Sequence, residues 1–351
     1  MSDFTLRQRI GALLYEGPRF LRTWLPSSPG ERNPWTAIRN RRERITPGDR
    51  GYRCEWQWTS ELHIAKVFPS TGLALMKRAL ADWPIRLANE PASISGDPVV
   101  SFVIGHRGIA RLPHLLLTIR SIAAQETVPI ECIVVEQSIT PEAKERVPAW
   151  ARYVHTPIPR PGFPYCRSWA LNAGARMARG TIVVLHDNDM LVPARYAAEL
   201  VQRHRRGGEF LDLKRFSFYL SERHTARILE SNELLLDEPP ESVVQNLKGA
   251  SIAADRDAYW KIGGFDESFV GWGGEDNDFR DRAETRTIDD FGYLPMVHLW
   301  HAPQPEKLQR EKAPAVARYE EISRIPVADR IVLLLKRDQG KTDAPSIGGE
   351  S

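Results

Sequence analysis

Short apolar strands alternate with helices from about residue 96 onward, and this alternation is the strongest constraint on the fold. The predicted strands are "VVSFVIG" (99–105), "IECIVVEQ" (130–137), "TIVVLHDND" (181–189) and a late one, "YLPMVHLWH" (293–301). The predicted helices are "LPHLLLTIRSIAAQ" (112–125), "TPEAKERVPAW" (140–150), "YCRSWALNAGARMARG" (165–180) and a segment at about 193–206. Strand, helix, strand, helix predicts an α/β fold with a mostly parallel sheet flanked by helices.

The chain falls into three regions of different composition. Residues 1–95 are rich in Arg, Trp and Pro, and only "TGLALMKRALADW" (71–83) has the periodicity of an amphipathic helix. Residues 96–330 hold the alternating pattern. Residues 331–351 are mostly polar toward their end, a composition typical of disorder. We therefore expect an irregular N-terminal extension, one α/β domain and a largely disordered C-terminal tail.

Composition also narrows the cellular setting. The formal net charge of +3 gives no indication of a nucleic-acid partner. The three cysteines are scattered without CxxC spacing, which favours a reducing compartment and argues against a thiolate metal site. No apolar run reaches the roughly 20 residues needed to span a bilayer, and the start of the chain lacks the pattern of a secretory signal. We expect a cytoplasmic protein.

Polar residues follow the predicted strands where each one ends. Ligands of parallel sheets bind beyond the carboxyl ends of the strands, so these residues are candidates for a binding site. Arg107 follows the first strand and can pair with a diphosphate, or it is a solvated loop residue. Glu136 ends the second strand, where it can accept a hydrogen bond from a ribose or a base. Gly105 and His106 are the other candidates at the end of the first strand. Arg167 and Asn172, on the helix that precedes the third strand, are further candidates.

The third strand ends in two carboxylates, Asp187 and Asp189. Alternate positions of an extended chain point the same way, so both can face one ligand. Hard oxygen ligands suit Mg²⁺ or Mn²⁺, which bridge to phosphate oxygens. The other interpretation is a polar strand end that leads into a turn, because Asp-x-Asp is a common pattern.

Two histidines three positions apart, His298 and His301, lie in the late strand. An imidazole beside the carboxylate pair can complete a Mn²⁺ site, although a histidine in an apolar strand is more often a core residue. Because the two positions differ by an odd number, they face opposite sides of a regular strand and cannot both bind one metal. His301, at the end of the strand, is the preferred ligand.

The segment "GWGGEDNDFRDR" (271–282) holds three glycines, Trp272 and four acidic residues. A capped helix start explains the acids, which favour the helix dipole, but it does not explain a tryptophan between glycines. Glycines let the backbone turn tightly and close over a ligand. Glu275 and Asp276 would then stand at a helix start beside that ligand, where a carboxylate can accept a proton.

These residues carry a family resemblance. "IGGFDESFVGWGGEDNDFRDR" (262–282) closely resembles the Gly-Trp-Gly-Gly-Glu-Asp segment of the β-1,4-galactosyltransferases and of bacterial chondroitin-polymerase-type transferases. "ALNAGARMARGTIVVLHDNDMLVP" (170–193) resembles the Asn-Gly-Ala to Asp-x-Asp stretch of the same group. The resemblance covers about residues 99–305 and implies an inverting glycosyltransferase of the GT-A fold. Residues 1–95 match no family that we recognise.

The resemblance implies a role for each matching residue. Asp189 would bind the metal, Mn²⁺ or Mg²⁺, and Asp187 would lie nearer the ribose of the nucleotide. Asp276 would be the base and Glu275 an acceptor contact. The remaining implied contacts are Arg107 and Arg167 with the diphosphate, Trp272 with donor and acceptor on a mobile loop hinged by Gly273 and Gly274, and His301 with the metal, where His298 or Met296 is the alternative.

Together these features predict a metal-dependent inverting transfer of a sugar from a UDP-linked donor to a saccharide or lipid-linked saccharide acceptor, in bacterial surface glycan synthesis. Inversion needs a base opposite the departing nucleoside diphosphate and a cation to neutralise its charge. A sugar nucleotidyltransferase is one alternative, but "GHRGIARLP" (105–113) is a poor version of the phosphate loop that it would need. A non-catalytic nucleotide- or glycan-binding protein is the other, and it would tolerate loss of the intact Glu275 and Asp276 pair.

Residues 1–50 hold ten arginines against five acids. Apolar insertion combined with charge attraction is typical of segments that lie on an anionic membrane, so peripheral association with the inner face of the membrane is one expectation. The other is that these residues pack on the catalytic domain, with their arginines paired to its acids. The interleaved apolar residues are Phe4, Leu6, Leu13, Leu14, Phe20 and Trp24.

Overall fold

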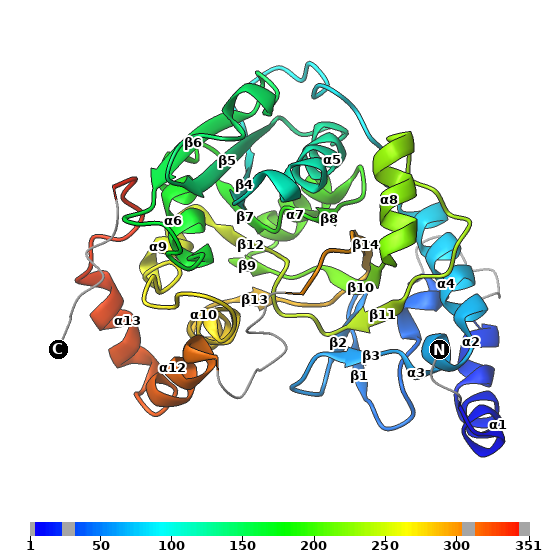
Figure 1. Cartoon of the computed structure of the whole chain (residues 1–351). Helices are drawn as coiled ribbons and strands as arrows, with labels where there is room; N and C mark the ends of the chain where they lie inside the picture. The colour runs from blue at the N-terminus through cyan, green and yellow to red at the C-terminus, as the bar shows by residue number, and fades with distance from the viewer. Residues whose placement is uncertain (1–3, 23–31, 304–312, 344–351) are drawn as a thin grey trace.

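The structure of the chain is a computed structural model that describes residues 4–22, 32–303 and 313–343 (Figure 1). Within these residues the larger main sheet has seven strands, in spatial order β13 (Ile288–Asp289), β9 (Phe210–Leu211), β12 (Ser251–Asp255), β7 (Ile182–His186), β4 (Val100–His106), β5 (Ile130–Ser138) and β6 (Arg152–Pro157). Strands β7, β4, β5 and β6 are parallel neighbours, whereas β12 pairs antiparallel with β7 and β9. The predicted α/β fold with a mostly parallel sheet is confirmed.

Apolar side chains of this sheet alternate between two buried faces. On β4, Phe102 and Ile104 belong to one apolar core, and Val103 between them belongs to the other. Burial on both faces is the reason why these strands read as continuous apolar runs. Three of the four predicted helices, together with one short helix, cover the two faces of the sheet. These are α5 (Leu112–Ala123) and α7 (Tyr196–Arg205) on one face, and α6 (Arg167–Met177) and α9 (Arg256–Lys261) on the other.

A second, five-stranded sheet stands beside the first and was not predicted. Its strands, in spatial order, are β3 (Ser60–Glu61), β11 (Ser242–Gln245), β10 (Lys214–Tyr219), β14 (Leu294–His298) and β8 (Met190–Leu191). The short strand β8 follows β7 almost directly and pairs antiparallel with β14. This pairing brings the predicted late strand to the edge of the large sheet where Asp187 and Asp189 lie.

The N-terminal region is more regular than the expected extension, and most of it packs on the second sheet (Figure 1). Trp35 is fully buried against Phe216 of β10, with 6.0 Å between ring centroids, and its indole N–H donates to Asp82 at 2.8 Å. Arg215, also of β10, donates from Nε to the carbonyl of Thr36 at 2.6 Å. The remaining elements of the region are α1 (Leu6–Tyr15), α2 (Gly17–Arg22), η1 (Pro34–Ala37), β1 (Ile45–Pro47), β2 (Tyr52–Cys54), α3 (His63–Val67) and the predicted helix α4 (Pro69–Asp82).

The helix predicted over residues 140–150 is wrong. Only the short 3₁₀ turn η3 (Lys144–Arg146) forms there. The buried carboxylate of Glu136 accepts hydrogen bonds from the backbone amides of Glu142 and Ala143 at 3.0 Å each, so a strand residue captures the amides that would begin a helix. Pro148 follows closely and restricts the residue before it to extended geometry.

The C-terminal tail is also more ordered than expected, as far as residue 343. Helices α12 (Pro314–Ile322) and α13 (Val327–Leu335) lie beside α10 (Glu275–Ala283) at one end of the molecule (Figure 1). Gln339 is buried and donates to the carbonyl of Gly263 at 2.6 Å. The carbonyl of Lys341 accepts from the indole of Trp169 at 2.6 Å. Disorder is therefore the wrong expectation for residues 331–343, while residues 344–351 lie outside the described part.

Candidate active site

A pocket of about 1040 Å³ opens at the carboxyl ends of β4 and β7 and is lined from both main sheets. Most of the residues singled out from the sequence line it, although they come from five separate stretches of the chain. These are Gly105, Arg107, Arg167, Asp187, Asp189, Trp272, Gly273, Gly274, Glu275, Asp276, His298 and His301.

At one end of the pocket, one carboxylate and two imidazoles converge. Asp189 follows β7, and the pairing of β8 with β14 sets His298 beside it. His298 Nε2 lies 3.7 Å from Asp189 Oδ1, and His301 Nε2 lies 3.3 Å from Asp189 Oδ2. The ligand atoms of all three residues lie within 4.8 Å of one another. The strand ends at His298, so the alternation rule does not extend to His301, and the expectation that only one of them can reach the site is wrong.

The donor set of this cluster fits a divalent cation. Asp189 is 4% exposed and its Oδ1 has no hydrogen-bond partner among the described residues. Burial would raise the pKa of Asp189, but His298, Arg111 and His301 hold it at about 2, so the carboxylate is ionised. Burial lowers the pKa of His298, which keeps that imidazole neutral, as metal binding requires. Met296, the third candidate ligand, is buried in the core instead.

Arg111 is a site residue that sequence reasoning missed. It ends the 3₁₀ turn η2 (Ile109–Arg111), and its Nη2 donates to Asp189 Oδ2 and, at 2.9 Å, to Asn188 Oδ1. The predicted diphosphate ligand Arg107 lines the pocket too, but its guanidinium donates to the carbonyls of Gln137 and Phe163 at 2.9 and 2.6 Å. Arg111 is thus the arginine of this pair that lies at the cluster of Asp189, His298 and His301.

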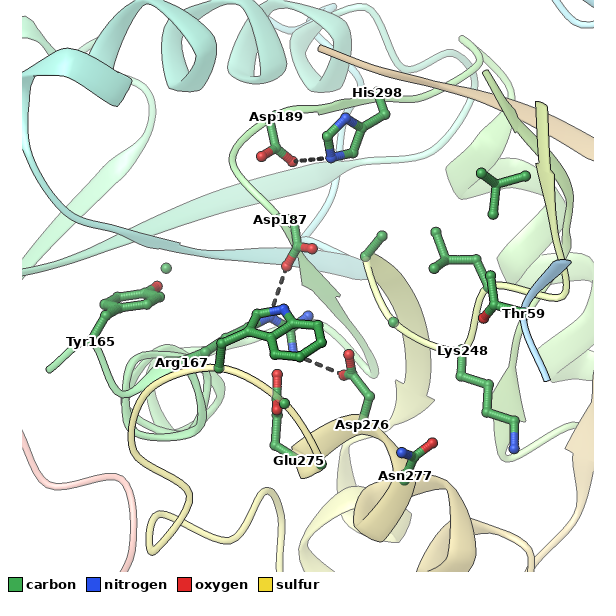
Figure 2. A pocket seen from close by; sticks show the side chains of 18 of the residues that line it. Thr59, Tyr165, Arg167, Asp187, Asp189, Lys248, Glu275, Asp276, Asn277 and His298 are labelled. Carbon is green, nitrogen blue, oxygen red and sulfur yellow. Dashed lines mark hydrogen bonds and ion pairs between the residues drawn. The ribbon is translucent and has the colours of Figure 1, made fainter. Parts of the chain in front are cut away.

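Arg167 joins the two halves of the pocket. It is the first residue of α6, and its Nε donates to Asp187 Oδ1 at 2.8 Å while its Nη1 donates to Asp276 Oδ1 at 3.0 Å (Figure 2). Asp187 follows β7, as Asp189 does, so this chain of ion pairs leads from the strand end to the start of α10. The side chain of Arg167 is only 14% exposed. Away from water, its charged hydrogen bonds fix both carboxylates in place.

The four acidic residues of the glycine-rich segment lie in two different environments. Glu275 and Asp276 line the pocket at the start of α10, whose N-cap Gly274 has a φ of 88°. Asp278 is buried one turn later and pairs with Arg282 and Arg330 at 2.7 Å each. The fourth acid, Asp281, accepts from Tyr319 and Arg330 on the helices behind. The helix is therefore anchored by its later acids and presents its first two to the pocket.

The first two acids differ in their partners. Burial and the neighbouring Asp276 raise the pKa of Glu275 to about 7, and its Oε2 is buried with no hydrogen-bond partner in the described residues. Burial also raises the pKa of Asp276, and its ion pair with Arg167 opposes that shift. Glu275 is therefore the member of the pair that holds a proton more readily, and Arg167 favours the ionised form of Asp276.

Three predicted binding residues lie outside the pocket. Glu136 is fully buried and holds the turn after β5, so it is not free to meet a ribose or a base. Asn172 is fully buried too, and it donates to the carbonyl of Phe265 at 2.8 Å. Its role is to fasten α6 to the segment that precedes the glycines. His106 is 1% exposed and contacts Asn188 behind the pocket wall.

Other lining residues come from segments that gave no signal in the sequence. The N-terminal segment contributes Gln57, Trp58 and Thr59, and the loop after β11 contributes Lys248 and Gly249. A Cβ added at Gly249 would lie 2.1 Å from Asp276 Oδ2, so this loop closes directly on the predicted base. No periodicity or motif marks these residues, because they lie in loops beside short strands of the second sheet.

Two models of protein families match the chain. The model described as glycosyl transferase family 2 matches residues 110–266, and the model described as the N-terminal domain of galactosyltransferase matches residues 240–301. The first match contains Asp189, and the second contains Glu275, Asp276 and both histidines. Neither model describes a nucleotidyltransferase or a non-catalytic binding protein. No curated protein matches the chain.

Solved structures of three enzymes are remotely similar. A Drosophila β-1,4-galactosyltransferase 7 mutant, in complex with manganese, UDP-Gal and xylobiose, is 12% identical, with a TM-score of 0.38 over 62% of this chain and 75% of that one. A mannosyltransferase from Pyrobaculum calidifontis, with GDP-Man and Mn²⁺, is 19% identical, with a TM-score of 0.39 over 76% and 80%. A glucosyl-3-phosphoglycerate synthase from Mycobacterium tuberculosis, with Mn²⁺, UDP and phosphoglyceric acid, is 17% identical, with a TM-score of 0.42 over 68% and 86%.

Proposed function

We propose that the chain is a GT-A-type glycosyltransferase that transfers a sugar, with inversion, from a nucleotide donor to a saccharide acceptor. One segment of it matches the family 2 model and another the galactosyltransferase model. One observation carries the proposal: a cluster fit for a cation and a pair of carboxylates face the same pocket and are joined through Arg167. The resemblance of residues 262–282 to β-1,4-galactosyltransferases favours a UDP-linked donor. We take residues 96–330 as the catalytic domain, completed by the packed part of residues 1–95.

The donor end of the pocket is the cluster of Asp189, His298 and His301. These residues would hold Mn²⁺ or Mg²⁺, and two imidazoles favour Mn²⁺. When bound, the cation neutralises the negative charge that develops on the departing diphosphate. Arg111 lies against the same carboxylate, so its guanidinium is placed to bind a diphosphate oxygen at the cluster.

The acceptor end of the pocket is the pair of Glu275 and Asp276. Arg167 keeps Asp276 ionised and oriented, so Asp276 can take the proton of the acceptor hydroxyl as that oxygen attacks the sugar. Glu275, with a pKa of about 7, holds a proton below that pH and can donate a hydrogen bond to the acceptor. The positive φ of Gly273 (105°) and Gly274 (88°) lets the turn carrying Trp272 stand close over the pocket.

A panel of nucleotide sugars tests this function. The purified chain is incubated with each donor and Mn²⁺, without acceptor, and release of the nucleoside diphosphate is measured. We expect hydrolysis of one donor that stops in excess chelator. Exchange of a nucleoside triphosphate with a sugar phosphate, without hydrolysis of any donor, would point to a nucleotidyltransferase instead.

The N-terminal helices favour an acceptor at a membrane surface. No helix among the described residues is long and apolar enough to cross a bilayer. However, Leu6, Ile10, Leu13 and Leu14 follow the spacing of one face of α1 and are 47–73% exposed, and Leu21 of α2 is 68% exposed. Trp24, one of the interleaved apolar residues of the predicted segment, lies outside the described residues.

The charge around this apolar face complements an anionic lipid surface. Arg7, Arg9 and Arg22 are exposed on the same two helices, whereas the acid Glu16 is buried. We propose that α1 and α2 lie in the interface of an anionic cytoplasmic leaflet and bring the pocket to a lipid-linked acceptor of surface glycan synthesis. Packing on the domain, the alternative expectation, occurs over residues 34–82, where Trp35 and its neighbours are buried.

A further inference from the structure

A tryptophan from the N-terminal region stands exposed in the pocket. Trp58 lines the pocket although it lies outside both matched family segments, and it is 65% exposed. Burial of an indole removes a large apolar surface from water and is favourable. An exposed indole that lines a pocket is therefore a good contact for a ligand, which would bury it on binding.

The segment that carries Trp58 is fixed to the wall of the pocket. Asn246, with a φ of 56°, donates from its side-chain amide to the carbonyls of Trp56 and Trp58 at 2.7 and 3.1 Å. In return, Thr59 Oγ1 donates to the carbonyl of Asn246 at 3.0 Å, and the next two residues form β3 against β11. The backbone that bears Trp58 is therefore positioned before any ligand arrives, which lowers the entropic cost of binding.

A lysine without a counter-ion follows on the same wall. Lys248 lines the pocket, two residues after Asn246, and forms no ion pair in the part of the chain that the structure describes. In Figure 2 Lys248 lies on the side of Asp276 that faces away from Asp189 and His298. Its neighbour Gly249 packs against Asp276, so the wall that carries Lys248 reaches the carboxylate pair.

We propose that Trp58 and Lys248 form an acceptor subsite for a saccharide that carries a negative charge. The apolar C–H face of a sugar ring packs on the indole of Trp58, and the ammonium of Lys248 binds a carboxylate on the acceptor. A charged acceptor explains why the pocket keeps an unpaired cation although the acids Glu275 and Asp276 line the same pocket. The inference rests on the proposed transferase function, because it assumes that the acceptor meets Asp276.

Matched methyl glycosides that differ only at C6 test the subsite. The glucoside is compared with the glucuronide, and the galactoside with the galacturonide, using the donor that the hydrolysis panel identifies. We expect the acidic member of at least one pair to have the lower KM. Lys248→Gln should remove this preference, a change of roughly fivefold, while Lys248→Arg keeps it. Lys144→Gln, which removes an exposed lysine of η3 outside the pocket, is the matched control.

Trp58 is tested on the same glycosides. Trp58→Ala should raise the KM of acidic and neutral acceptors alike by about tenfold, the effect of losing one stacking contact, and Trp58→Phe should restore part of the loss. The KM for the donor and the rate of donor hydrolysis should stay unchanged in both variants. Equal KM values for acidic and neutral acceptors, an unchanged KM in Trp58→Ala, or no transfer to any glycoside while the donor is hydrolysed would each overturn the subsite. Absence of donor hydrolysis in the parent would instead count against the transferase function.

Discussion

Arg167 and Asp276 form an ion pair at 3.0 Å although 109 positions separate them in the sequence. The same guanidinium holds Asp187 at 2.8 Å, so one partly buried arginine sets the distance between the strand end that follows β7 and the start of α10. The proposed transfer depends on this spacing, because the leaving group is held at one end of the pocket and the acceptor is deprotonated at the other.

Loss of Arg167 should cost stability as well as activity. Arg167→Met leaves two carboxylates facing each other without their shared partner, and we expect the free energy of unfolding in urea to fall by about 1–3 kcal/mol. Arg179→Met is the matched control, because Arg179 pairs with Glu131 but is 66% exposed. Its loss should cost less than about 1 kcal/mol. Equal effects of the two variants would contradict a bridging role for Arg167.

Metal binding can be measured without any substrate. Asp189→Ala should abolish the binding of Mn²⁺ as followed by calorimetry, because it removes the carboxylate on which both histidines converge. His298→Ala and His301→Ala should each weaken binding at least about tenfold. His204→Ala, a histidine paired with Asp255 away from the pocket, should bind like the parent. If both pocket histidines can be removed without change, the cation is held elsewhere.

Glu275 should make stability depend on pH. Its pKa in the folded protein is about 7, above its ordinary value of 4.5, so the folded state binds a proton more tightly than the unfolded state between these values. The contribution of Glu275 to stability is therefore fully present below about pH 4.5 and is lost as the pH rises through 7. Glu275→Gln lacks this loss, so it should be more stable than the parent at pH 8 and match it more closely at pH 5. A difference in melting temperature that does not change with pH would exclude the raised pKa.

Membrane docking predicts a salt-sensitive interaction. The parent should sediment with vesicles that contain phosphatidylglycerol and not with phosphatidylcholine alone, and the bound fraction should fall as salt rises. Leu13→Glu, on the exposed face of α1, should abolish binding without lowering the melting temperature, because its side chain is 54% exposed. Val332→Glu, an exposed apolar position on α13, is the control and should bind like the parent. Failure of the parent to bind anionic vesicles would contradict membrane docking. Dimers of the parent that Leu13→Glu dissociates would show instead that the exposed face of α1 is a protein interface.

Strands β4, β5 and β7 of the large sheet were predictable because each is a run of apolar residues buried on both faces. The periodic helices α5 and α6 lie between these strands in the chain, which favours parallel pairing. Strands β6, β9, β12 and β13 were not predicted. The second sheet was not predictable in this way. Strands β8 and β3 have two residues each, too few for any periodicity, and β10 and β14 lie far apart in sequence.

The site was only partly predictable for the same reason. Asp189 and Asp276 stand at a strand end and a helix start, which are recognisable places. Arg111 ends a single 3₁₀ turn, and nothing in the sequence shows that this turn faces Asp189. The prediction that Glu136 binds a ligand was wrong. A carboxylate at a strand end looks the same in the sequence whether it binds a ligand or the backbone of the next turn.

The most direct test of the proposed function compares Asp276→Asn with Glu275→Gln. Asp276→Asn keeps the shape of the side chain but cannot accept a proton, so turnover with acceptor should fall by roughly 10²-fold or more. Calorimetric affinity for the nucleoside diphosphate should barely change, because Asp276 acts on the acceptor. Glu275→Gln, which resembles the protonated acid, should retain most of the turnover. Turnover of Asp276→Asn equal to that of the parent, or a larger loss in Glu275→Gln, would contradict Asp276 as the base.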